Sequence, residues 1–134
     1  MPKVAKAKKT QQWIHAALED AKLLDIAVLD VRKISDFTDY MIIATGTSSR
    51  HVQSAADKVA DKLREHDVRP IGIEGKQVGD WVLVDFGDVV VHLMREQMRD
   101  FYNLEKLWSD AKQVEPDAAK PVRPRKKKTK PKKT

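Results

Sequence analysis

The chain of 134 residues contains no cysteine, which excludes disulfide bonds and thiolate metal sites. It has no stretch approaching the ~18 consecutive apolar residues that a membrane-spanning helix needs. Its first ten residues, MPKVAKAKKT, are basic but lack the apolar core of a secretory signal. The length is typical of one domain. We therefore expect a single-domain protein of a reducing compartment, with no membrane contact, and assign it to the cytoplasm.

Patterns typical of catalysis or metal binding are also missing. The four histidines, at positions 15, 51, 66 and 92, lie far apart in the sequence, without the HxxxH or HxH spacing of a metal site. The residues GTSSR at 46–50 lie between a strand and a helix and could hold an anion at the helix start. They do not form a Walker-type phosphate loop, and helix capping explains their hydroxyl groups more simply.

Nucleotidyl transfer is a more specific enzymatic hypothesis than anion binding, because it requires carboxylates on neighbouring strands to hold two metal ions. Asp39, Asp85 and Asp88 are the candidates, but no DxD pair stands on a predicted strand. We therefore expect no catalytic residue, no metal and no cofactor.

Charge is divided unevenly along the chain. Residues 1–9 contain four lysines, residues 112–134 contain ten basic and two acidic residues, and residues 10–111 contain 12 basic and 18 acidic residues. This pattern predicts an acidic domain at 10–111 between a flexible basic arm at 1–9 and a tail at 112–134. The tail is rich in Lys, Arg and Pro and has few large apolar residues, so we expect it to be disordered.

Basic residues cluster within that tail. They are the candidates for contacting RNA phosphates, although a solvated charged tail is the simpler alternative. The cluster consists of Arg123, Arg125, Lys126, Lys127 and Lys128.

Hydrophobic spacing predicts the order αββαβββα. The first helix, capped by Thr10 and running to about residue 23, has apolar residues at i, i+3, i+4 and i+7. Further elements are expected at 26–31 and 40–45 (strands), 49–66 (helix), 71–74, 81–86 and 89–94 (strands), and 97–111 (helix). A parallel crossover should join 40–45 to 71–74, followed by an antiparallel meander. The predicted fold is α/β, with a single mixed sheet and packed helices.

The hairpin at 81–94 has two distinct faces. With Gly87 and Asp88 as its turn, side chains alternate between the faces along each strand. The entirely apolar face, expected in the core, consists of Val82, Val84, Phe86, Val89, Val91 and Leu93. The other face consists of Trp81, Leu83, Asp85, Val90, His92 and Met94. Because Trp and Met are enriched at protein interfaces, this second face is either a docking surface, which a homodimer could also use, or is covered by a helix.

Several blocks in one order resemble the signature of the ribosomal silencing factor family, which includes Iojap. They are DYMIIATGTSSRH at 39–51, EG at 74–75, DWVLVDFGDVVVHL at 80–93 and YNLEKLW at 102–108. The resemblance extends from about residue 12 to residue 109 and excludes both basic ends. It implies a fold like that of nucleotidyltransferases, in a family not known for catalysis.

The resemblance also implies a function. Members of the family bind the large ribosomal subunit through ribosomal protein fourteen, block its association with the small subunit and repress translation when nutrients are limited. Organelle relatives act in ribosome assembly. The alternatives are a degenerate or active nucleotidyltransferase and a tail-driven RNA-binding or assembly factor that contacts ribosomal RNA. The expected docking residues, taken from strand alternation with two flanking acids, are Trp81, Leu83, Asp85, His92, Met94, Glu74 and Asp80.

Overall fold

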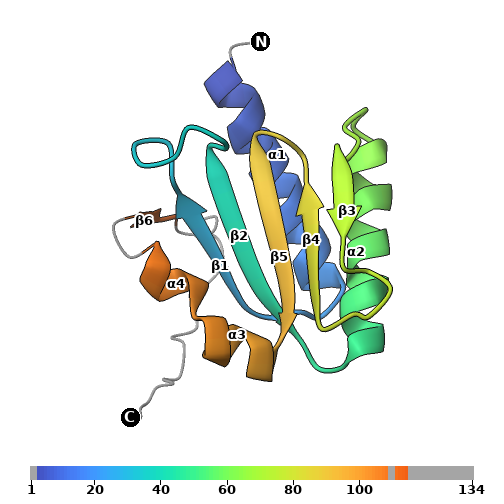
Figure 1. Ribbon diagram of the computed structural model, residues 1–134. Coiled ribbons are helices and arrows are strands. Elements are labelled where there is room, and N and C mark those ends of the chain that lie inside the picture. The colour runs from blue at the N-terminus through green and yellow to red at the C-terminus, as the bar shows by residue number, and fades with distance from the viewer. Residues whose placement is uncertain (1–2, 109–110, 115–134) are drawn as a thin grey trace.

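The computed structural model describes residues 3–108 and 111–114. These residues form one six-stranded mixed sheet with the strand order β3-β4-β5-β2-β1-β6 (Figure 1). Helices α1 (Lys3–Asp20) and α2 (Ser49–Arg64) lie behind the sheet in this view, and the short helices α3 (Glu96–Tyr102) and α4 (Leu104–Leu107) lie at its lower left. The strands are β1 (Leu24–Asp30), β2 (Tyr40–Gly46), β3 (Gly72–Glu74), β4 (Trp81–Asp85), β5 (Val89–Arg95) and β6 (Lys112–Gln113). The predicted α/β class with a single mixed sheet is confirmed.

The hairpin of β4 and β5 has the predicted register. Trp81 pairs with Met94 and Asp85 pairs with Val90. Gly87 adopts φ +87°, a backbone conformation that glycine tolerates without a side-chain clash. The main chain of Phe86 then donates to the carbonyl oxygen of Val89 over 2.9 Å and closes the turn. The period-two alternation therefore placed every side chain of the hairpin on its correct face.

The hairpin separates β2 from β3. Strand β2, YMIIATG, is buried along its whole length and pairs in parallel with β5. β3 lies at the edge of the sheet and pairs with β4. The predicted parallel direction of β2 and β3 follows from these pairings. The two strands are not neighbours, however, because β5 and β4 lie between them.

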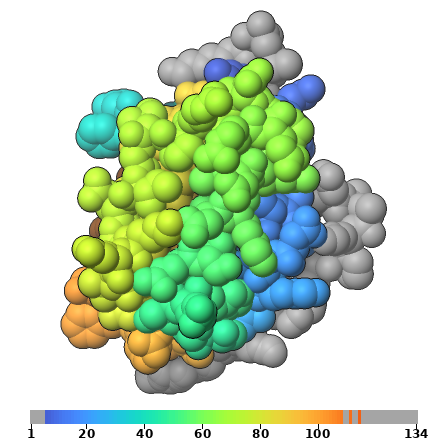
Figure 2. All heavy atoms as spheres, turned by 90° about the vertical axis from the view of Figure 1, so that its right-hand side faces the viewer, coloured from blue at the N-terminus to red at the C-terminus, as the bar shows by residue number. Residues whose placement is uncertain are grey.

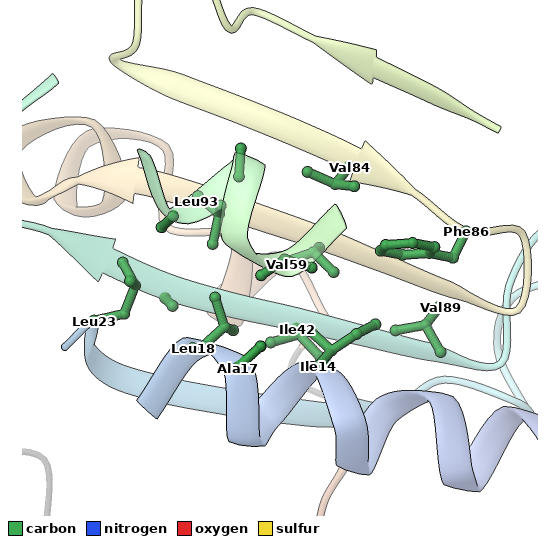
Figure 3. Close-up of a cluster of buried hydrophobic side chains, with 14 of the residues drawn as sticks. Ile14, Ala17, Leu18, Leu23, Ile42, Val59, Val84, Phe86, Val89 and Leu93 are labelled. Carbon is green, nitrogen blue, oxygen red and sulfur yellow. The ribbon is translucent and has the colours of Figure 1, made fainter. Parts of the chain in front are cut away.

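The main core lies between the sheet and the helices α1 and α2. The apolar face of the hairpin is buried there, as predicted. The apolar stripes of α1 and α2 face the sheet at helical spacing, because residues three and four apart share one side of a helix. Figure 3 shows these side chains meeting from both layers: Ile14, Ala17, Leu18, Ile42, Val59, Val84, Phe86, Val89 and Leu93.

Helix α1 begins earlier than predicted. Thr10 is not its cap but an interior residue, whose hydroxyl donates to the carbonyl oxygen of Lys6 over 2.9 Å. Ala7 is fully buried in the main core and continues the apolar stripe toward the N-terminus. The prediction of a flexible arm at 1–9 is therefore wrong for residues 3–9, where alanine and lysine also favour helix.

The predicted last helix at 97–111 is divided at Asn103. This residue adopts φ 47°, its main chain donates to Arg99, and its side chain caps α4. Beyond α4 the chain returns to the sheet: β6 pairs with β1, and Val114 donates to the carbonyl oxygen of Val28 over 2.8 Å. Ordered structure thus continues past residue 111. The remainder of the predicted tail, with its cluster at Arg123–Lys128, lies outside the described residues.

Candidate docking surface

Helices α3 and α4 cover only one part of the sheet face opposite the main core. Met98, Leu104 and Trp108 pack there on a second hydrophobic cluster, whose buried members are Leu29, Val31, Met41, Ile43 and Met94. Met94 has no exposed surface, so the prediction that it contacts a partner is wrong. Over this part of the face, the covered-face interpretation is confirmed. Among the described helices, none lies over the front of β4 and β3 in Figure 1.

An open hollow of about 290 Å³ lies on that uncovered part. It is lined by Glu74, Gly75, Trp81, Leu83 and His92, so four predicted docking residues meet around one site. Trp81 and Leu83 come from β4 and are half-buried, and Glu74 pairs with Leu83 from the edge strand. Figure 2 shows the yellow-green segment of β3 and its following loop on the same side of the molecule as the orange α3. We call these five lining residues the docking surface.

The Trp81 side chain is held by a hydrogen bond to His92. Its indole Nε1 donates to Nδ1 of the imidazole over 3.0 Å. The two residues are diagonal neighbours on the hairpin, since Leu83 is the residue that pairs directly with His92. An Nδ1 that accepts must be unprotonated. Burial favours that state, because it disfavours the imidazolium and lowers the pKa of His92 to about 4.

Two aromatic residues of α3 extend this surface. The rings of Tyr102 and Trp81 have centroids 4.9 Å apart, and Phe101 packs edge-on against Tyr102 at 4.9 Å. Phe101 lies at helical spacing from Met98 and Leu104, but 79% of its surface is exposed. Helical spacing gave no signal of this exposure, because consecutive residues of one helix, such as Ala17 and Leu18, can both face a core.

Asp85 and Asp80, also predicted to dock, make contacts within the domain. The Asp85 carboxylate accepts from the main chain of Gly87 over 2.8 Å and supports the hairpin turn. The Asp80 carboxylate accepts from Ser49 at 3.0 Å and from Arg95 at 3.3 Å, which joins the start of α2 to the end of β5. Both residues lie outside the lining of the hollow.

The polar residues at the start of α2 act as caps. Ser48 is the N-cap, and its hydroxyl accepts from the main chain of His51 over 3.0 Å. The His51 ring in turn accepts from the main chain of Thr47 over 2.9 Å. The capping interpretation of this segment is confirmed. Within the described ranges, no three His, Asp or Glu side chains are grouped so as to hold a metal ion, and no helix is long and apolar enough to cross a membrane.

Comparison with known proteins decides the family. The family model described as "Ribosomal silencing factor during starvation" matches residues 4–134. The chain belongs to this family. Ribosomal silencing factor RsfS of Chromobacterium violaceum is 49% identical over 96 residues, which are 72% of this chain and 79% of the relative.

Two further relatives extend the comparison. The mouse protein named "Mitochondrial assembly of ribosomal large subunit protein 1" is 40% identical over 106 residues, 77% of this chain and 46% of its own. A crystal structure of a Chromobacterium violaceum protein superposes with a TM-score of 0.75 at 41% identity, covering 83% of this chain and 92% of that one. The predicted ribosomal silencing factor family is therefore confirmed in sequence and in fold.

Proposed function

We propose that this protein binds the large ribosomal subunit through ribosomal protein fourteen, blocks association with the small subunit and represses translation when nutrients are limited. The observation that carries the proposal is the open hollow with Trp81 at its edge. A large aromatic side chain beside a hollow is typical of the few residues that contribute most binding energy at an interface. Membership of the ribosomal silencing factor family and the names of its relatives support the ribosome as the partner. The proposed site of action is accordingly the cytoplasm.

Charge favours a protein partner over bare RNA for the domain itself. Residues 10–111 carry six more acidic than basic residues, and Glu74 lies at the hollow. An acidic surface is drawn to a basic ribosomal protein and repelled by RNA phosphates. The basic tail would then contact neighbouring ribosomal RNA. In this proposal the protein acts by steric exclusion and not by catalysis.

The decisive experiment replaces Trp81 with alanine. Loss of a central aromatic anchor costs at least about 2 kcal/mol, so Trp81→Ala should bind purified large subunits roughly thirtyfold or more weakly. Co-sedimentation measures the affinity, and sucrose-gradient profiles measure subunit association. Trp13→Ala is the matched control, because Trp13 also contacts a histidine: in the helix layer, its ring stacks on His66 with centroids 3.8 Å apart. That variant should lose stability but keep its affinity.

Each alternative has its own outcome. A folded Trp81→Ala protein that binds with wild-type affinity would place the docking surface elsewhere. A wild-type dimer that Trp81→Ala converts to a monomer, without affecting the ribosome, would assign the hollow to self-association. Magnesium-dependent nucleotide transfer that is lost in Asp85→Ala would replace steric exclusion with an enzymatic function.

A further inference from the structure

The hydrogen-bonding capacity of Trp81 is satisfied within the protein. Its only donor, the indole N–H, is directed at Nδ1 of His92. Tyr102 packs against the same indole. The hollow beside it is lined mainly by apolar atoms. The ring surface of Trp81, and not its polar group, is therefore what a partner meets.

We propose that His92 is the positioning residue of the docking surface, holding the Trp81 indole through Nδ1 so that the hollow accepts an apolar side chain of the partner protein. The inference rests on the proposed function of this surface. His92 itself is only 9% exposed, so it offers a partner little area to contact. We therefore expect most of its effect on binding to pass through Trp81.

Two physical consequences follow from this arrangement. In the unbound protein, an indole that turned away would lose both its hydrogen bond to His92 and its contact with Tyr102. The orientation needed for binding is therefore already present before the partner arrives. Such preorganisation removes part of the entropy cost of binding. In addition, a partner that offered a hydrogen-bond acceptor to Trp81 would gain nothing, because the N–H is already paired. A polar side chain placed in the apolar hollow would lose its water without compensation. The site therefore selects an aliphatic or aromatic side chain.

The test separates the role of His92 as a hydrogen-bond acceptor from the role of its side-chain volume. His92→Asn retains an acceptor oxygen near the position of Nδ1, whereas His92→Leu and His92→Phe fill the site without an acceptor. Trp81→Phe removes the donor. In protein labelled with nitrogen-15, the indole N–H signal of Trp81 is the one that Trp81→Phe lacks. The same variants are then measured for affinity to purified large subunits.

In either acceptor-free variant, the indole signal should shift and its hydrogen should exchange faster. Affinity should fall about fivefold, as expected for one net hydrogen bond. His92→Asn should keep the indole signal and the affinity close to those of the wild type. In the Trp81→Phe background, His92→Leu should cause no further loss, because the two residues act as one unit.

Other outcomes overturn the inference. A loss of affinity that persists in the Trp81→Phe background would show that His92 acts by its own contact or packing. Wild-type affinity despite an altered indole signal would show that positioning is dispensable. The Trp81→Ala variant distinguishes a failure of this inference from a failure of the proposed docking surface. If it weakens binding while both acceptor-free variants bind normally, only the role of His92 is rejected. If it binds normally, the docking surface is rejected together with this inference.

Discussion

The burial of His92 should make the stability of the protein depend on pH. Burial lowers the pKa of His92 from its ordinary 6.5 to about 4, whereas the unfolded chain keeps the ordinary value. Above the ordinary value the imidazole is neutral in both states, and the folded protein has its full stability. As the pH falls from there toward 4, the unfolded chain takes up a proton that the folded protein does not. Folding stability must therefore decrease through this range.

The size of the effect follows from the difference between the two pKa values. Each unit corresponds to about 1.4 kcal/mol, so the free energy of unfolding should fall by about 3 kcal/mol on reaching pH 4. That is a large fraction of the roughly 5–15 kcal/mol that stabilises an ordinary domain. The same proton would occupy the acceptor of Trp81 at Nδ1. Acid should thus weaken the docking surface and the fold together.

Urea denaturation between about pH 7 and pH 4 measures this contribution. His92→Asn is the comparison, because asparagine keeps an acceptor and does not titrate. The two proteins share every other ionisable group, so the difference between the two curves isolates the histidine. The wild-type curve should fall more steeply with acid. Parallel curves would refute the argument and show that His92 is protonated as readily in the folded as in the unfolded protein.

Three other changes test separate features. Gly75→Ala should lower both the melting temperature and the affinity for the ribosome. Gly75 has φ +82°, and a Cβ there would lie 2.3 Å from the carbonyl oxygen of Trp81. Gly72→Ala is the control, because a Cβ at Gly72 meets nothing within 4 Å. Arg99→Leu should lower the free energy of unfolding by about 2 kcal/mol, because it removes the buried donor that serves Thr45 and the main-chain oxygen of Asp25; an unchanged urea midpoint would contradict this. Truncation after Val114 removes nine basic and two acidic residues, so large-subunit binding should weaken more at low than at high salt; loss at every salt concentration would favour tail-driven binding.

Features set by short-range periodicity could be predicted from the sequence. The alternation from Trp81 to Met94 predicted the hairpin register and both of its faces, because one apolar face fixes the register against slipping by a residue. Hydrophobic spacing predicted β2 as a strand, and the serines before α2 predicted its cap. Trp81, Leu83 and His92 could be assigned to one surface for the same reason.

Features that depend on long-range contacts could not be predicted. Arg99 is 3% exposed and donates to Glu105, to the main-chain oxygen of Asp25 and to Thr45, partners that its neighbouring residues do not reveal. These bonds hold α3 on the sheet, and the left-handed Asn103 then turns the chain into α4. The position of that turn decides which part of the second face is covered. Met94 is buried for this reason, although its strand pattern is the same as that of Trp81.

The second face of the sheet is covered by helices over only one of its two parts. Trp81 packs against the second hydrophobic cluster and also lines the hollow, so it belongs to both parts. On the β1 side of this face, helices α3 and α4 form the covering layer, to which Met98, Leu104 and Trp108 contribute. Toward β3 the described chain supplies no such layer. A docked ribosomal protein would take the place that another helix occupies in a fully covered sheet. The affinity of the complex would then draw on the same apolar packing that stabilises the fold, with Tyr102 and Trp81 at the junction. Mutations of Met98 should accordingly weaken both folding and binding, whereas mutations of Leu83 should weaken binding alone.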